Sequence, residues 1–228
     1  MSRPPQISPV NPLPPVVMVL LLIMIVNEAI FSLGASRILP WPAAIGWRLQ
    51  AIQDYGFYGQ IVDDLLFRGQ IDLDRIMRFF TYSFIHYNFT SAVFGCVFIA
   101  ALGKYVGEIF RPLSVLAVFF GSAIGGAFVY GLLLNSAVPL AGAFPGAYGL
   151  IGAFTYILWI RLDSLGQNQL AAFRLIGVLM GIKLIFALMF GGTVVWIADI
   201  AGFVFGFLLS FVLKPGGWSE LLARIRRD

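Results

Sequence analysis

Charged residues are scarce in this chain, and cysteine and histidine are almost absent. Of its 228 residues, 11% are charged and 60% are hydrophobic, whereas a soluble domain averages about 25% charged residues. The single cysteine, Cys96, excludes an internal disulfide and a cysteine-based metal cluster, and the single histidine, His86, argues against a histidine-based metal site. We therefore expect no metal and no other cofactor. The composition is typical of a protein that crosses a membrane several times.

Six apolar stretches are long enough to cross a bilayer, which takes about 20 mostly apolar residues. They are Leu13–Leu33, Phe80–Leu102, Pro112–Leu134, Ala141–Ile160, Leu170–Phe190 and Thr193–Leu213. We therefore expect an all-α membrane protein, a six-helix bundle over residues 13–214 with a long outer loop at 34–79. A short tail, residues 1–12, precedes the bundle, and a basic segment, residues 215–228, follows it. A signal peptide cleaved near Gly34-Ala35-Ser36 is the alternative for the first stretch, although its apolar run is long for one.

Basic residues are distributed unevenly over the predicted loops. Six spans put both termini on one side, together with the loops near residues 103–111 and 161–169. The basic residues of that side are Arg3, Lys104, Arg111, Arg161, Arg174, Lys214, Arg224, Arg226 and Arg227. The long loop on the other side balances five arginines with five aspartates. Because a basic excess marks the cytoplasm, we expect cytoplasmic termini. Short loops and the lack of eukaryotic targeting signals favour a bacterial inner membrane.

The end of the chain and the outer loop both show features of a membrane interface. The tail Trp218–Asp228 combines apolar and basic residues, which suits a helix on anionic lipid or a simple positive-inside anchor. In the outer loop, aromatic and aliphatic residues recur with a rough helical period, which predicts one or two helices half-sunk in the interface. Four aspartates there lack the spacing of a calcium loop and are more typical of a solvated face: Asp63, Asp64, Asp72 and Asp74.

Small residues at four-residue spacing allow helices to pack closely inside a bilayer, where apolar side chains alone do not drive association. Gly202 and Gly206 form such a pair in the last span. Gly142, Gly146 and Gly149 are predicted to line one face of the fourth span. These glycines indicate a compact bundle with the fourth span among its neighbours.

Three ionisable residues, Glu28, Lys183 and Asp199, fall inside predicted spans, where charge is costly and is a default indication of function. Lys183 and Asp199 lie at similar distances from the turn near Gly191-Gly192, roughly 12 Å below the surface. We expect them to face each other as an ion pair or a hydrogen-bonded pair. In the alternative, Lys183 extends to the interface and Asp199 is protonated against Tyr148. Glu28 belongs to this candidate polar cluster or reaches the interface at the end of its span.

Three segments carry a resemblance to a known family. Residues 77–86 read Met-Arg-Phe-Phe-Thr-Tyr-Ser-Phe-Ile-His, residues 142–153 read Gly-Ala-Phe-Pro-Gly-Ala-Tyr-Gly-Leu-Ile-Gly-Ala, and residues 191–206 read Gly-Gly-Thr-Val-Val-Trp-Ile-Ala-Asp-Ile-Ala-Gly-Phe-Val-Phe-Gly. They resemble the rhomboid family of intramembrane serine proteases. That family writes them roughly as Trp-Arg-x-x-Thr-x-x-x-x-His, Gly-Ala-Ser-Gly-Ala-x-Tyr-Gly-Leu-x-Gly-Ala and Gly-Gly-x-Val-Ala-Trp-x-Ala-His-x-x-Gly-Phe-x-x-Gly.

The resemblance implies a rhomboid fold whose chemistry has been lost. Phe144 stands at the position of the nucleophilic serine, and Asp199 stands at the position of the general-base histidine. The side chains that hold the oxyanion in the family correspond to Ser91 and Gly95, and Pro145 has no backbone N–H to offer. Because a serine hydroxyl needs an adjacent base to become a nucleophile, the expected protein is a catalytically inactive pseudoprotease. Ser83 is expected to bond to His86 as a satisfied polar pair rather than as a displaced dyad.

The resemblance also indicates a function. It implies a pseudoprotease that binds transmembrane segments of other integral membrane proteins as an adaptor, chaperone or assembly factor. The alternative is a fixed accessory subunit of a larger membrane complex. A working protease with unusual residues is less favoured. So is a small transporter that uses Glu28, Lys183 and Asp199, since no inverted repeat or pair of broken helices supports one. The expected partners are membrane proteins and lipids, not nucleic acid.

Overall fold

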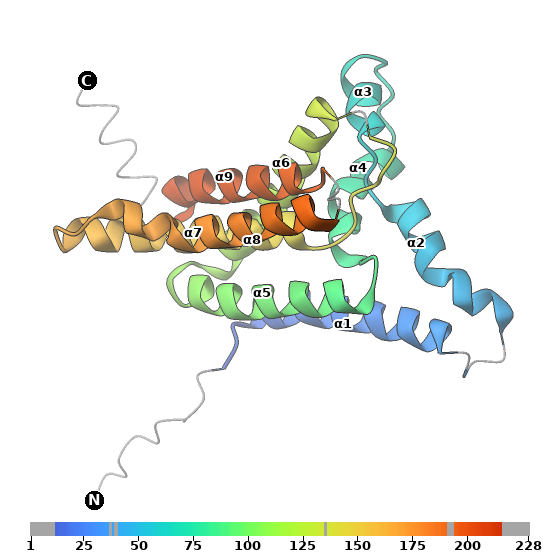
Figure 1. Ribbon diagram of the computed structural model, residues 1–228, viewed down its shortest axis with the longest axis horizontal. Coiled ribbons are helices and arrows are strands. Elements are labelled where there is room, and N and C mark those ends of the chain that lie inside the picture. The colour runs from blue at the N-terminus through green and yellow to red at the C-terminus, as the bar shows by residue number, and fades with distance from the viewer. Residues whose placement is uncertain (1–11, 37, 39–40, 135, 191–193, 216–228) are drawn as a thin grey trace, which may run out of the picture.

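A computed structural model describes residues 12–36, 38, 41–134, 136–190 and 194–215 (Figure 1). The predicted tail up to residue 11, the Gly191-Gly192-Thr193 turn and the basic segment beyond residue 215 lie outside these residues. Over the described residues the chain is helical, apart from an isolated antiparallel bridge between Phe57 and Leu140. The all-α class is therefore confirmed.

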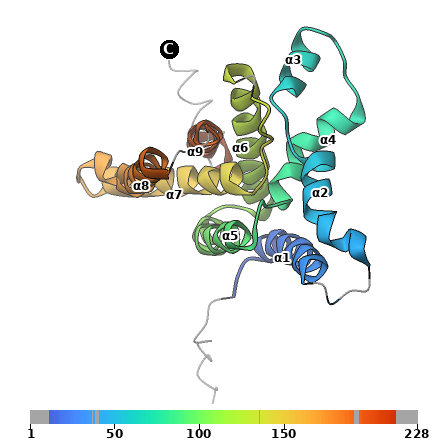
Figure 2. The same cartoon turned by 45° about the vertical axis from the view of Figure 1, so that its right-hand side comes forward.

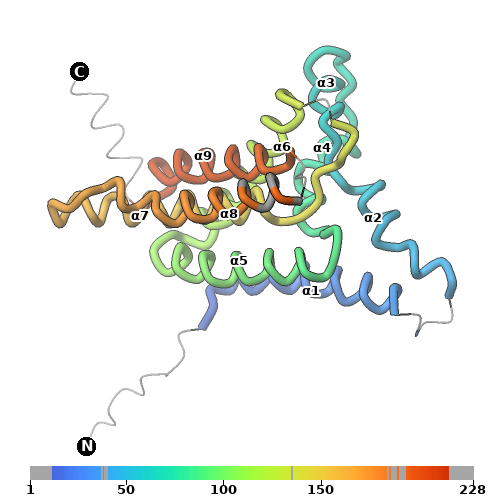
Figure 3. Tube along the Cα trace, in the orientation of Figure 1, coloured from blue at the N-terminus to red at the C-terminus, as the bar shows by residue number. Residues whose placement is uncertain are grey.

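Among the described residues, six long helices correspond in order to the six predicted spans. They are α1 (Pro15–Ala35), α5 (Phe89–Ile109), α6 (Pro112–Leu133), α7 (Phe144–Ser164), α8 (Arg174–Phe190) and α9 (Trp196–Leu213). Figure 3 shows that the start of α1 and the end of α9 lie at the same end of the bundle. Four of these helices, α1, α5, α6 and α9, are long and apolar enough to cross a membrane. The chain is thus an integral membrane protein by fold and composition.

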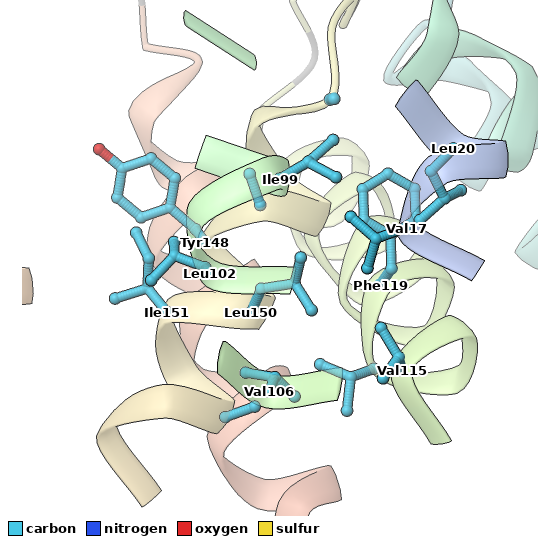
Figure 4. Close-up of a cluster of buried hydrophobic side chains, with 14 of the residues drawn as sticks. Val17, Leu20, Ile99, Leu102, Val106, Val115, Phe119, Tyr148, Leu150 and Ile151 are labelled. Atoms are coloured by element: carbon cyan, nitrogen blue, oxygen red, sulfur yellow. The ribbon is translucent and has the colours of Figure 1, made fainter. Parts of the chain in front are cut away.

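The helix α7 is less apolar than the four spans because its neighbours cover it. Every residue from Pro145 to Ala153 is buried, and helices α5, α6 and α9 pack around this stretch. Glycine and tyrosine are therefore tolerated on all of its faces. Figure 4 shows the adjoining cluster of buried side chains, in which Tyr148 lies at the edge with its hydroxyl pointing away. The labelled members come from α1, α5, α6 and α7: Val17, Leu20, Ile99, Leu102, Val106, Val115, Phe119, Tyr148, Leu150 and Ile151.

The predicted start of the second span was wrong. The sequence predicted Phe80, but α5 begins at Phe89 and runs on to Ile109. Asn88 caps the helix, since its side chain accepts a hydrogen bond from Ser91 N (2.8 Å) and its own N–H donates to Ser91 Oγ (3.3 Å). Residues before the cap belong to α4 (Leu73–Thr81) and to the 3-10 helix η2 (Tyr82–Phe84). Polar residues are scattered among the apolar ones on both sides of Asn88, so the sequence does not mark this boundary clearly.

The long outer loop is helical, as its periodicity predicted, but its described residues form three α-helices and a 3-10 helix rather than one or two helices. It contains η1 (Pro42–Gly46), α2 (Trp47–Tyr55), α3 (Gln60–Leu66) and α4, and Figure 2 shows α2, α3 and α4 beside the end of the bundle where α5, α7 and α9 begin. Arginines pair with three of the four aspartates discussed above. Asp64 bonds to Arg68 (3.0 Å) and Arg75 (3.1 Å). Asp72 also pairs with Arg75, and Asp74 with Arg78 (2.9 Å).

Glycines set the contacts of α7 with α6 and α9. A Cβ added at Gly206 would overlap with the backbone of Gly149, and one at Gly202 would overlap with the backbone of Pro145. At Gly146 a Cβ would lie 2.6 Å from the ring of Phe119 on α6. These glycines therefore pack as the sequence suggests.

Gly142 does not belong to this face, which corrects the prediction. It precedes α7 and has a φ of +118°, a backbone conformation that favours glycine. Here the chain turns from the preceding loop into the helix, and the N–H of Gly142 donates to the carbonyl of Tyr82 (2.9 Å).

Substituting Gly206 with alanine is expected to destabilise the fold. The added methyl group has no room against Gly149, so α7 and α9 must separate, at a cost of about 1–3 kcal/mol. Gly181→Ala on α8 is the matched control, because a Cβ there meets nothing within 4 Å. Thermal unfolding of the detergent-solubilised protein measures both. Equal midpoints for the two variants would contradict the close α7–α9 packing.

Candidate functional site

A cavity of about 460 Å³ lies where α5, α7 and α9 begin, and we call it the site cavity. Its walls include Ser91 of α5, Phe144 and Pro145 of α7, Lys183 of α8 and Asp199 of α9. The side chains of Tyr82 and Tyr87, which precede α5, complete one wall. The structure thus brings residues from four long helices into one place, including the two positions, Phe144 and Asp199, that the sequence singled out.

Lys183 lies at the centre of the polar side chains in this region. Its Nζ donates to Oδ2 of Asp199 and lies 5.4 Å from the ring centre of Phe144 and 4.9 Å from that of Tyr148. A cation at this distance over an aromatic face is attracted by the ring quadrupole. The Lys183 side chain is 36% exposed, whereas that of Asp199 is 5% exposed. Both side chains line the site cavity, and the carboxylate is the more deeply buried member of the pair.

Glu28 does not belong to this cluster, and it does not reach the interface either. It is 7% exposed, and its carboxylate accepts from both terminal nitrogens of Arg48 (2.9 and 2.6 Å) and from Ser32 Oγ (2.8 Å). The guanidinium of Arg48 also lies 5.3 Å from the ring centre of Phe31. The prediction for Glu28 failed because its partner, Arg48, lies on α2 in the long outer loop. The arginines of that loop had been counted only against its aspartates.

Arg48 connects this second network to the site. Its Nη1 donates to the backbone carbonyl of His86 (2.9 Å). The imidazole Nε2 of His86 in turn accepts from the backbone N–H of Ala143 (3.2 Å), directly before α7. His86 is 2% exposed, and burial lowers its pKa to about 4, so the ring is neutral and able to accept this bond. His86 therefore holds the turn from which Phe144 and Pro145 start.

The predicted pair of Ser83 with His86 does not form. Ser83 is fully buried, and within the part of the chain that the structure describes its Oγ has no hydrogen-bond partner. The two positions assigned to the family's oxyanion donors have structural roles here. Ser91 Oγ donates to Asn88 O (2.8 Å), and Gly95 leaves space for the His86 ring, since a Cβ there would lie 2.9 Å from Nε2.

A comparison with protein families identifies the fold to which this site belongs. The sequence model of the Rhomboid domain matches residues 73–216, more than half of the chain. The chain belongs to the rhomboid family. The matched range runs from α4 to the end of α9 and contains every residue that lines the site cavity. Glu28 and Arg48 precede the matched part of this rhomboid protein. No protein with a curated description matches the chain.

Acidification is expected to destabilise this rhomboid protein through its single histidine. The unfolded chain binds a proton near the ordinary pKa of 6.5, whereas the folded chain binds it near 4. Between these values the unfolded chain binds more protons than the folded chain. The contribution of His86 to the free energy of unfolding is therefore full above about pH 6.5, and it declines by up to about 3 kcal/mol as the pH falls towards 4. Protonation also removes the acceptor for Ala143 N–H.

Thermal unfolding between about pH 7 and pH 5 measures this effect, since most carboxylates titrate lower. The control is His86→Gln, whose amide oxygen offers the same N–H an acceptor that does not titrate. Its midpoint is expected to change less over this range. The same decline in both proteins would show that His86 is not the responsible group.

Proposed function

We propose that this rhomboid protein is a pseudoprotease that binds transmembrane segments of other membrane proteins at the site cavity. One observation carries the proposal: Phe144 and the Lys183–Asp199 pair stand together at the place where the family's motifs put serine and histidine. An aromatic ring has no nucleophilic atom for acyl transfer. Asp199 is bonded to Lys183, so its carboxylate has a partner other than a nucleophile.

The surrounding groups also support a site without hydrolytic chemistry. Pro145 lies in the first turn of α7 and has no N–H with which to hold an oxyanion. The hydroxyl groups of three cavity residues donate to backbone carbonyls: Ser91 to Asn88, Tyr82 to Ala123 and Tyr87 to Pro139. A hydroxyl becomes a nucleophile when a base accepts its proton, and these three bonds do not supply a base.

The same region is suited to an apolar helix. Helix α8 presents a row of exposed apolar side chains, namely Val178, Ile182, Ile185 and Met189. A second cavity of about 230 Å³, lined by Met180, Lys183, Trp196 and Ile200, lies between α8 and α9. Inside a bilayer such surfaces are covered by lipid or by another helix. A bound segment that displaces lipid from α8 reaches the site cavity from the side.

The position in the cell is part of the proposal. We place the protein in a bacterial inner membrane because its loops are short and it lacks eukaryotic targeting signals. We place both termini in the cytoplasm because basic residues are in excess in the loops at that end. The long outer loop with α2, α3 and α4 then lies on the opposite side. This arrangement leaves the site cavity near the outer surface.

Photocrosslinking in native membranes tests the binding function. A photoreactive residue at Val195, which lines the site cavity, is expected to capture integral membrane proteins through their transmembrane segments. The matched control replaces Val97 of α5, whose side chain is 57% exposed away from this cavity, and is expected to capture mainly lipid. Capture of no protein at Val195, or of the same proteins at both positions, would contradict the proposal.

The same experiment separates the alternatives. One protein captured at a constant ratio indicates a fixed accessory subunit, whereas several exchangeable proteins indicate an adaptor or chaperone. Cleavage of a transmembrane reporter by the purified protein, abolished by Asp199→Ala, would overturn the pseudoprotease and establish a working protease.

A further inference from the structure

We propose that the ammonium group of Lys183 recognises a carboxyl side chain carried inside the membrane by the bound transmembrane segment. This inference rests on the proposed function and names the chemistry of the partner. It follows from the hydrogen-bonding capacity of the cavity wall, from the exposure of the two charges and from the position of Lys183 between two cavities.

Lys183 has donor capacity left after its partners in the structure are counted. An ammonium group has three N–H donors, and one of them bonds to Asp199. The rings of Phe144 and Tyr148 attract the charge but accept no ordinary hydrogen bond. Over the described residues the structure gives Lys183 Nζ no second oxygen partner. By contrast, the hydroxyl groups of Tyr82, Tyr87 and Ser91 each donate to a backbone carbonyl.

The two members of the ion pair differ in exposure, and this difference bears on which charge a bound segment meets. The Asp199 side chain is 5% exposed, whereas that of Lys183 is 36% exposed. Lys183 lines both the site cavity and the smaller cavity beside Trp196 and Ile200. Asp199 lines the site cavity as well but not the smaller one, so a segment that enters through the smaller cavity meets the cation of the pair and not the anion.

A carboxyl group fits this position better than other polar groups. An acidic side chain at membrane depth is costly, and it is tolerated when it meets an opposite charge. Hydrogen bonds between charged partners are also stronger than those between neutral ones. A second cation is repelled by Lys183, and a purely apolar helix gains nothing from it. The cavity thus favours segments that carry an aspartate or glutamate.

Model peptides can test this selectivity directly. The purified protein in nanodiscs is mixed with labelled polyleucine helices that carry Asp, Asn, Lys or no polar residue at a central position, and binding is measured by energy transfer. The wild-type protein is expected to bind the Asp helix about tenfold more tightly than the plain helix, with the Asn helix between them and the Lys helix weakest.

Variants of this protein complete the test. Lys183→Met is expected to abolish the preference for Asp, whereas Lys104→Met, at the other end of α5, is expected to retain it. Lys183→Met combined with Asp199→Leu removes the pair without leaving a buried carboxylate alone, and it is expected to behave like Lys183→Met. A preference for Asp that survives in both Lys183 variants would overturn the inference.

The outcome separates this inference from the proposed function. Equal binding of the four helices to the wild-type protein would overturn the recognition of carboxyl groups and leave segment binding intact. Failure of all four helices to bind would count against the binding function itself and against the inference with it.

Discussion

A charge inside a bilayer needs an opposite charge, and the pairing of Lys183 with Asp199 meets this requirement at the centre of the site. The pair connects α8 to α9, and the rings of Phe144 and Tyr148 connect the same ammonium to α7. Asp199 is buried, so without Lys183 it would be an uncompensated carboxylate. The pair therefore ties α8 to α9 at the site cavity, in addition to the apolar contacts that Ile176 and its neighbours on α8 make with the core.

The scaffold around this interaction is held by contacts that need no catalytic group. Glycines let the backbones of α7 and α9 approach, and His86 fixes the turn before α7 through the N–H of Ala143. Arg48 joins Glu28 of α1 to the carbonyl of His86. These contacts explain how a rhomboid fold persists although a phenyl ring and a carboxylate occupy its chemical positions. The fold is stabilised by packing and backbone bonds, whereas the reaction depends on a few side chains.

The order of the long helices could be predicted from the sequence, because membrane helices have long apolar runs. The ends of these runs also predict how deep each residue lies in the membrane. Equal distances from one turn were enough to bring Lys183 and Asp199 together. The partner of Glu28 was missed because Arg48 lies on a loop helix whose direction no periodicity reveals. The start of α5 was missed because Asn88, which caps the helix, is one of several polar residues scattered through that stretch and does not stand out among them. Gly142 was assigned to a helix face, since its positive φ cannot be read from a glycine-rich segment.

The most direct test of the central claim is a double-mutant cycle on the charged pair, measured as the free energy of unfolding in detergent. Lys183→Met leaves Asp199 buried and alone and is expected to cost more than Asp199→Leu, which leaves a lysine that the cavity exposes. The double variant is expected to be more stable than the sum of the single effects predicts, by about 1 kcal/mol or more. Additive effects, with neither single variant less stable than the wild-type protein, would show that the pair does not hold the site together.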